Sequence, residues 1–296
     1  MRKDRLLLRF VCGWLAIGFF SVFQARAEDD PRMTPLVRVM KEWAPSIVNI
    51  STERVVLVRS HPFWKLYGNL FDDFYNQFGH SGVGTMKLNS LGSGVVVSED
   101  GLIMTNAHVV NMASKIYVVL NSGEHLEASV VGLKPGDDLA LIKITPPRPL
   151  KPLKVAKDIL IGETVVSVGN PLGLENSVSS GIVSGLNRKF YLGGRQDYVL
   201  DGLIQTDASI NFGSSGGALL NLAGELVGIN LAVAQNAQGI GFAVPYTYIQ
   251  RVLDEYATGE LAPPAQGTIQ VPVRKAPEEA SARERSIILK VPVKNK

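Results

Sequence analysis

The chain has 296 residues, of which 46% are hydrophobic and 19% charged, so it holds enough apolar material for one large core or two small ones. This composition excludes collagen-like, coiled-coil and fully disordered chains. The formal net charge is +3, but residues 1–27 carry five basic side chains against Asp4 and contribute +4, which leaves −1 for the remainder. The charge therefore gives no support to nucleic-acid binding. Because the one cysteine, Cys12, lies in the same segment, we expect no disulfide, thiol chemistry or cysteine-bound metal elsewhere.

Residues 1–27 have the pattern of an export signal. A basic start precedes a mostly apolar run from Leu6 to Phe23, and Ala25-Arg-Ala27 places small residues at the two positions that a signal peptidase reads. Cleavage after Ala27 gives a mature protein that begins at Glu28. The alternative is an uncleaved anchor, because about 18 apolar positions nearly span a bilayer. Membrane association is expected only in that case.

Two short helices are predicted to flank a body of strands. Thr34 followed by Pro35 indicates a helix start, and apolar residues then recur at helical spacing to Trp43 before Pro45 ends the run. The second helix opens at Pro245 and repeats that spacing. Between them, β-branched runs alternate with Gly, Asn and Asp turns, which predicts strands at 47–58, 93–97, 116–120, 128–131, 139–144, 164–168 and 225–230. This pattern indicates an antiparallel sandwich or barrel.

One similarity within the chain favours two barrels. Residues 94–106 resemble residues 217–230, each reading as a strand, a tight turn and a strand. We therefore predict barrels at about 45–145 and about 155–245, joined by the four-proline segment 145–154.

Two further segments stand apart from the predicted barrels. Residues 61–90 form a long insertion rich in Phe, Tyr and Trp. Residues 261–296 carry seven basic and three acidic side chains around one short apolar stretch, and are predicted to be a poorly ordered basic tail.

The segment Gly213-Ser214-Ser215-Gly216-Gly217 fits the G-x-S-x-G pattern of serine hydrolases. An α/β-hydrolase needs a helix after the serine and a later catalytic histidine, whereas all four histidines of this chain precede Ser215 and a hairpin follows it. The remaining order that fits antiparallel barrels is His…Asp…Ser. His108 ends an apolar strand, and Asp137-Asp138 stands just before the strand at 139–144. Residues at strand ends can be directed towards one cleft.

Seven short motifs occur along the chain: Ser93-Gly94, Thr105-Asn-Ala-His108-Val-Val, Asp138-Leu-Ala-Leu-Ile-Lys, Val168-Gly-Asn-Pro-Leu-Gly173, Ser180-Gly-Ile-Val-Ser184, Ile204-Gln-Thr-Asp207 and Gly213-Ser-Ser215-Gly-Gly. Together they resemble the HtrA family of trypsin-like serine proteases. The resemblance runs from about residue 34 to residue 257. It implies an all-β fold of two six-stranded antiparallel barrels, peptide-bond hydrolysis in unfolded or misfolded exported proteins, a periplasmic location and a homotrimer. The aromatic insertion then corresponds to the family's regulatory loop.

The same resemblance assigns the reacting groups. Ser215 is the nucleophile, His108 the base, and Asp138 the acid that orients the imidazole. The backbone N–H groups of Gly213 and Ser215 are expected to face the developing oxyanion. No metal or cofactor is required.

The substrate pocket is predicted from the position of Ser209, six residues before the nucleophile. A carboxylate there selects Lys or Arg at P1 in trypsin-like folds. Here Ser209 offers no carboxylate, Ile210 is expected to narrow the pocket, and Asp207 is expected to have a structural role. We therefore expect cleavage after small or medium aliphatic residues. The candidate substrate-binding residues are Ile210, Ser214, Asn230, Leu231 and Ala232.

Two departures from the family pattern affect these expectations. Ser214 stands where the family usually has asparagine, and the 36 residues after Glu260 are too few for the PDZ domain that most members carry. Substrate capture through a PDZ domain is then absent or comes from another chain. The alternative function is a chaperone-like or adaptor protein that keeps a resting, non-hydrolytic protease fold.

Overall fold

A computed structural model describes most of the predicted protease region. The described residues are 30–57, 85–111, 113–169, 177–191, 199–211, 213–233 and 239–261, without the side chains of 54–57, 85–90, 191, 232 and 233. The predicted signal segment 1–27, most of the insertion 61–90 and the tail from residue 262 lie outside them. The chain divides into two compact units, 1–41 and 42–296.

Helix α2 (Pro35–Trp43) begins where the sequence predicts. The hydroxyl of Thr34 accepts a hydrogen bond from the N–H of Val37 at 3.3 Å, which satisfies one of the free donors of the first turn. The helix ends at the 3₁₀ turn η1 (Ala44–Ser46), which contains the predicted proline stop. None of the described helices is long and apolar enough to cross a membrane.

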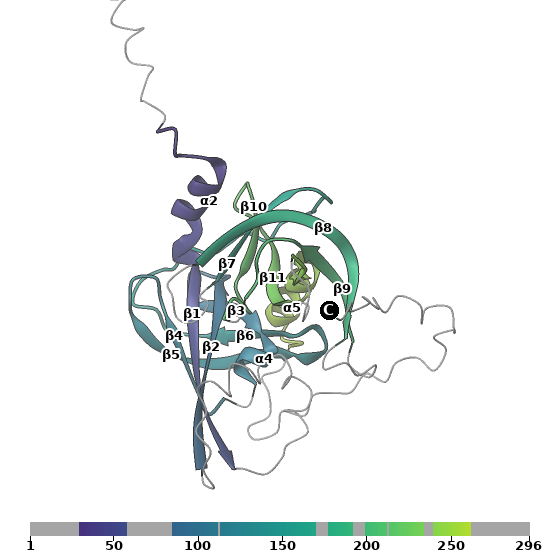
Figure 1. Ribbon diagram of the computed structural model, residues 1–296. Helices are drawn as coiled ribbons and strands as arrows, with labels where there is room; N and C mark the ends of the chain where they lie inside the picture. The colour runs from purple at the N-terminus through teal and green to yellow at the C-terminus, as the bar shows by residue number, and fades with distance from the viewer. Residues whose placement is uncertain are drawn as a thin grey trace, which may run out of the picture. The chain divides into compact units, whose positions relative to one another are not determined.

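Two closed six-stranded antiparallel barrels follow, as predicted (Figure 1). The first consists of β1 (Ile47–Leu57), β2 (Thr85–Val96), β3 (Leu102–Asn106), β4 (Lys115–Val119), β5 (His125–Lys134) and β6 (Leu139–Lys143). The second consists of β7 (Thr164–Gly169), β8 (Ser177–Tyr191), β9 (Val199–Thr206), β10 (Ala218–Asn221), β11 (Leu226–Val233) and β12 (Gly241–Pro245). Two short elements belong to the first half, α4 (Ala107–Val110) and η2 (Pro135–Asp137), and α5 (Tyr246–Thr258) follows the second barrel.

The two barrels have the same strand order, but the predicted repeat does not relate equivalent strands. The first barrel closes in the order β1-β2-β3-β6-β5-β4, and the second in the order β7-β8-β9-β12-β11-β10. The counterpart of the β2–β3 hairpin is therefore β8–β9, whereas the similar segments at 94–106 and 217–230 form β2–β3 and β10–β11. The two segments resemble each other because each forms a tight, buried hairpin. What is repeated in the structure is the order of the strands in the two barrels.

Each barrel encloses its own apolar core. In the first, side chains such as Ile50, Ile103 and Ile142 are fully buried, and in the second Ile204 and Leu219 are. Full burial of one aliphatic side chain of this size is worth about 1.5–3 kcal/mol, so these β-branched and leucine-rich runs provide most of the stability of the barrels.

The proline-rich segment 145–154 connects the barrels through backbone hydrogen bonds. The N–H of Leu153 donates to Val96 O in the first barrel at 2.9 Å, and Lys154 O accepts from the N–H of Leu226 in the second at 2.8 Å. Consecutive residues thus bond to opposite barrels, which fixes the strand ends of both barrels relative to each other.

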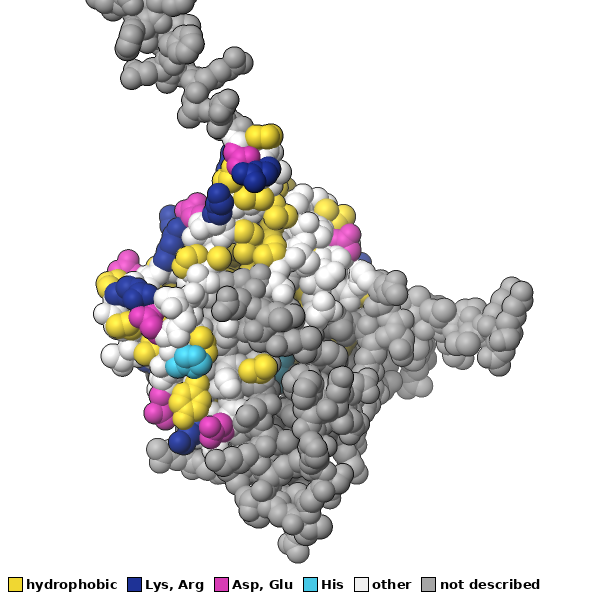
Figure 2. Space-filling view, turned by 60° about the vertical axis from the view of Figure 1, so that its left-hand side comes forward, with side chains coloured by type: hydrophobic (Ala, Val, Ile, Leu, Met, Phe, Trp, Pro, Cys, Tyr) yellow, Lys and Arg dark blue, Asp and Glu magenta, His cyan; other side chains and the backbone are white. Residues whose placement is uncertain are grey.

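Charged side chains are mixed on the described part of the surface. On the face in Figure 2, basic and acidic side chains are interspersed over the described atoms. Two ion pairs join charged side chains of the described residues, Lys143 with Asp100 at 2.6 Å and Arg148 with Glu124 at 2.9 Å. Lys143 and the hydroxyl of Ser98 lower the pKa of the Asp100 carboxyl below its usual value. Exposed pairs of this kind contribute little to stability.

Candidate active site

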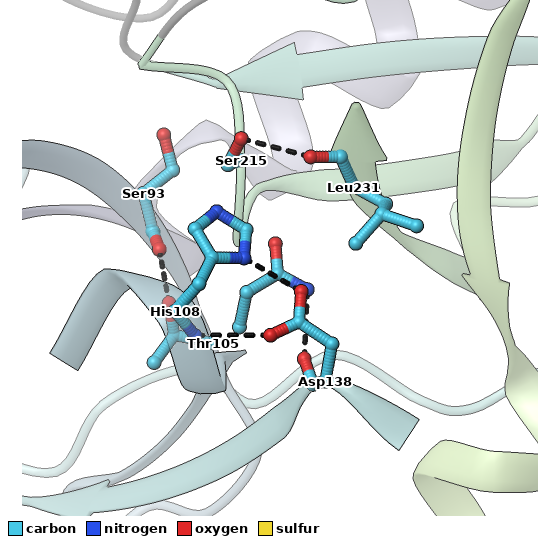
Figure 3. A network of polar contacts seen from close by, with 7 residues as sticks. Ser93, Thr105, His108, Asp138, Ser215 and Leu231 are labelled. Atoms are coloured by element: carbon cyan, nitrogen blue, oxygen red, sulfur yellow. Dashed lines mark hydrogen bonds and ion pairs between the residues drawn. The ribbon is translucent and has the colours of Figure 1, made fainter. Parts of the chain in front are cut away.

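His108 and Asp138 are joined by a short hydrogen bond at the end of the first barrel. The Nδ1 atom of His108 lies 2.6 Å from Asp138 Oδ2, and the backbone N–H of His108 donates to Asp138 Oδ1 at 2.9 Å (Figure 3). Both side chains are buried, with 6% of His108 and 1% of Asp138 exposed. One carboxylate therefore holds the ring and the backbone of the same histidine, which fixes both the position and the plane of the imidazole.

The local fold places this carboxylate. Asp138 follows η2 and adopts the left-handed conformation with φ +51° and ψ +41°, which is uncommon outside glycine but tolerated by Asp. Its carbonyl accepts from Asn106 Nδ2 at 3.0 Å and from the N–H of Ala107 at 3.1 Å. These bonds tie the end of η2 to the β3–α4 junction, next to His108 in α4.

Ser215 lies in the loop before β10, in the second barrel. In Figure 3 the imidazole of His108 lies between Asp138 and Ser215. The Ser215 hydroxyl donates to the carbonyl of Leu231 in β11 at 2.9 Å. The three residues predicted to form the triad are thus brought together from the two barrels, with the hydroxyl of Ser215 directed at a backbone carbonyl.

The backbone N–H groups around Ser215 divide into two sets. The N–H of Ser214 donates to Asn211 O, and the N–H of Gly217 donates to Ser214 O, each at 2.9 Å. Within the described part of the chain, the N–H groups of Gly213 and Ser215 have no backbone carbonyl partner. Both are residues whose N–H groups are predicted to face the oxyanion.

Two residues of the first barrel hold this loop, and the sequence reasoning gave them no role. Ser93 in β2 donates from Oγ to Gly213 O at 2.7 Å and from its N–H to Ser215 O at 2.8 Å. Thr105 in β3 donates from Oγ1 to the carbonyl of Ser93 at 2.8 Å (Figure 3). A buried hydroxyl in an otherwise apolar strand needs a hydrogen-bond partner. The two hydroxyl residues in these apolar strands were therefore the signal in the sequence that could have indicated the contacts.

Asn230, one of the predicted substrate-binding residues, lies in β11. Its side chain is fully buried, and Nδ2 donates to Ser167 Oγ, Val168 O and Ala218 O at 3.0–3.2 Å. The side-chain amide therefore joins β7, β10 and β11 below the surface, and the backbone carbonyl of Asn230 accepts from the N–H of Gly216 at 2.9 Å. Asn230 supports the nucleophile loop from behind.

The other predicted substrate-binding residues lie in the same region. The side chains of Ile210, Ser214 and Leu231 are buried, at 2%, 5% and 2% exposure, and the side chain of Ala232 lies outside the described residues. A methyl group added at Gly241 would lie 3.0 Å from Ile210 Cδ1, so Ile210 packs against β12. An apolar side chain thus occupies the space next to Ser209.

Asp207 has a backbone partner in β8. Its Oδ1 accepts from the N–H of Ile182 at 2.7 Å, and the adjacent Gly181 has no room for a Cβ because Asp207 Oδ1 would lie 2.3 Å from it. The carboxylate is therefore engaged by the strand rather than directed to Ser209. Among the described residues, no group of three or more His, Cys, Asp or Glu side chains could hold a metal ion.

Comparisons with known proteins agree with this geometry. Residues 92–229 match the trypsin-like peptidase domain. The chain is 38% identical over 261 residues to a probable periplasmic serine endoprotease DegP-like of Halomonas elongata, covering 81% of this chain and 52% of that protein. It is 36% identical over 283 residues to the periplasmic serine endoprotease DegP of Escherichia coli K12, covering 86% and 59%. The chain thus spans somewhat over half the length of these relatives.

Solved structures give the same assignment. The chain superposes on a serine-to-alanine variant of the HtrA-type protease AlgW with a decapeptide, with a TM-score of 0.63 and 33% identity over 77% of this chain and 68% of that one. A structure of AlgW with a tripeptide matches at a TM-score of 0.59 and 30% identity, covering 76% of this chain and 64% of that one. Fold, motif order and sequence identity agree, and the chain belongs to the HtrA family of trypsin-like serine proteases.

Proposed function

We propose that this chain is a serine endopeptidase that cleaves unfolded or damaged proteins in the periplasm. The observation that carries the proposal is the 2.6 Å contact between His108 Nδ1 and Asp138 Oδ2, with Ser215 on the other side of the imidazole. The periplasmic location is supported by the relatives from Halomonas elongata and Escherichia coli, which are named periplasmic endoproteases.

Acylation begins with proton transfer from Ser215 to His108. Because Nδ1–H donates a hydrogen bond to Asp138, the Nε2 atom of the neutral ring has a lone pair for the Ser215 proton. Ser215 Oγ attacks the scissile carbonyl carbon, and the imidazolium formed is stabilised by the Asp138 carboxylate. His108 then gives its proton to the leaving amine, and water repeats the sequence to release the acyl group.

The negative charge of the tetrahedral intermediate is stabilised by the N–H groups of Gly213 and Ser215. Loss of one such donor costs about 3 kcal/mol of barrier in related enzymes. A loop whose other N–H groups are already bonded keeps these two donors in place before the substrate arrives, so little reorganisation is needed during the reaction.

A second candidate function is favoured by the direction of the Ser215 hydroxyl. Its hydrogen bond goes to Leu231 O, so the hydroxyl hydrogen must turn away from that carbonyl before His108 can accept it. A protein that kept this hydrogen bond would bind polypeptides without hydrolysing them, as an adaptor or chaperone-like scaffold. Catalytic hydrogen bonds often align only when substrate binds, and we therefore favour the enzyme.

Digestion of casein separates the two functions. The parent protein is expected to produce fragments, and Ser215→Ala is expected to produce none while keeping the far-ultraviolet circular dichroism spectrum and melting temperature of the parent. Loss of the nucleophile leaves only the weak activity of the oxyanion site. Casein that stays intact with the parent, or equal cleavage by Ser215→Ala, would refute the proposed mechanism.

The cleavage sites in the same digest test the pocket. We expect Val, Ala or Ile at P1, because Ser209 offers no carboxylate and Ile210 fills the adjacent space. Burial of an unpaired ammonium or guanidinium costs several kcal/mol even after relaxation. Mass spectrometry of the fragments reports the P1 residues, and a majority of Lys or Arg would mean that Asp207 leaves Ile182 and enters the pocket.

The proposal includes assembly into a homotrimer, which rests on the family assignment. Light scattering at micromolar concentration is expected to give three times the monomer mass, and a monomer mass there contradicts this part of the proposal.

A further inference from the structure

One side chain of the first barrel contacts the loop that carries the proposed oxyanion donors. Ser93 is fully buried in β2, and its Oγ donates to the carbonyl of Gly213 at 2.7 Å. Its backbone N–H donates to the carbonyl of Ser215 at 2.8 Å. Gly213 and Ser215 are the two residues whose own N–H groups are proposed to bind the oxyanion. A single residue of the opposite barrel thus bonds to both.

The Ser93 hydroxyl limits the rotation of the Gly213 peptide. A peptide unit is planar, so the carbonyl of Gly213 and the N–H of Ser214 move as one body. Ser93 Oγ holds one end of this unit at 2.7 Å, and Asn211 O holds the other at 2.9 Å. Gly213 has φ +88°, in a region that glycine enters and leaves easily. The hydrogen bond from Ser93 therefore restrains one of the glycines that give this loop its backbone freedom.

The two contacts of Ser93 depend on different chemical groups. Almost any residue at this position provides the N–H that bonds to Ser215, whereas the bond to Gly213 requires a side-chain donor. Substitution of Ser93 by alanine therefore removes the second contact and keeps the first, which allows the role of the hydroxyl to be measured by itself.

We infer that Ser93 is a positioning residue whose hydroxyl fixes the Gly213–Ser214 peptide and, through it, orients the two flanking peptides that carry the oxyanion N–H groups of Gly213 and Ser215. The inference rests on the serine endopeptidase activity proposed above. Ser93 acts through Gly213, so its hydroxyl affects the stabilisation of developing charge more than the binding of the uncharged substrate. The expected signature is a change in kcat with little change in KM.

The test compares the parent with Ser93→Ala on a peptide with valine at P1. A neutral hydrogen bond of this kind corresponds to a rate change of about tenfold. We expect kcat per titrated active site to fall about tenfold and KM to stay within about twofold. The affinity for a peptide boronic acid, which forms a tetrahedral adduct on Ser215, should fall by the same factor as kcat/KM. The pH profile should keep its midpoint, because the contact between His108 and Asp138 is unchanged.

Ser46→Ala provides a matched control. Ser46 is also a fully buried serine, and its hydroxyl has no hydrogen-bond partner among the described residues. Loss of that hydroxyl should leave kcat, KM and boronic acid affinity at the parental values. Any general effect of removing a buried serine hydroxyl would appear in both variants.

Different results separate this inference from the proposed function. A Ser93→Ala variant with parental kcat and boronic acid affinity overturns the role of Ser93 and leaves the endopeptidase intact, whereas an inactive parent overturns both. If Ser93→Ala unfolds at the assay temperature, Ser93→Cys retains a side chain of similar shape with a much weaker donor. That variant should also lose kcat per active site selectively. Fewer active sites with an unchanged kcat at each would instead mean that the hydroxyl only supports folding, and would overturn the inference.

Discussion

The Asp138→Asn variant is expected to lose about four orders of magnitude in kcat, as in trypsin-like enzymes whose triad acid is replaced by its amide. The two contacts of Asp138 with His108 give the physical reason. Oδ1 accepts from the backbone N–H of His108, so the amide oxygen of asparagine takes that place. The NH₂ group then faces Nδ1 and donates to it, which moves the imidazole proton to Nε2. His108 in this tautomer cannot accept the proton of Ser215. Peptide hydrolysis at several pH values measures the loss.

Asp137→Asn is the matched control for this prediction. The substitution removes the same charge one residue earlier, where the carboxylate lies 3.6 Å from Arg251. A long ion pair near the surface contributes about 0–1 kcal/mol to stability, so we expect activity close to that of the parent. Equal activity of the two variants would contradict the assignment of Asp138 as the triad acid.

The Gly216→Ala variant is expected to lose nearly all reaction at Ser215. A Cβ at this position would lie 2.2 Å from the carbonyl oxygen of Ser93 and 2.3 Å from Thr105 Oγ1. Gly216 also has φ +82°, where an L-residue is strained by about 1–2 kcal/mol. Because Ser93 O is a backbone atom in a barrel strand, the loop has to move away from the first barrel. Overpacking of this kind typically costs a further 1–3 kcal/mol, about enough to displace the loop.

Gly123→Ala is the control that separates backbone strain at positive φ from steric overlap of the added Cβ. Gly123 has φ +87°, and an added Cβ would meet nothing within 4 Å. This variant should therefore show only the conformational penalty and retain its activity. Urea unfolding and active-site titration measure both variants. A Gly216→Ala protein that is as active and as stable as Gly123→Ala would show that the contact with Ser93 and Thr105 does not position Ser215.

The sequence predicted the fold class because apolar runs and turn residues follow the barrel strands closely. The first helix, the buried strands such as β6 and β7, and the two-barrel arrangement are all confirmed. Strand β8 was not predicted, because glycine and polar residues interrupt its apolar ones and much of its length has one exposed side. Glycine leaves one side of the strand without a side chain, so the alternation of apolar and polar residues that indicates a strand is harder to recognise there.

The candidate triad could be predicted because each residue occurs next to a recognisable local pattern. The interior position of the Asn230 side chain could not be predicted, because the described part of β11 is buried on both faces. In such a strand, apolar and polar residues do not alternate, so the sequence does not indicate which face a side chain lies on. The contacts of Ser93 were hidden for another reason. They join β2 to a loop 120 residues later in the chain, and only the closure of both barrels brings these segments together.

Labelling with a fluorophosphonate tests the central claim most directly, because the reagent phosphonylates only a serine whose proton is removed and whose oxyanion is stabilised. The parent protein should gain one adduct mass, located by peptide mapping on Ser215 and absent from His108→Ala. A folded parent that gains no adduct, or that carries it on a serine other than Ser215, would contradict the account of this chain as a serine endopeptidase.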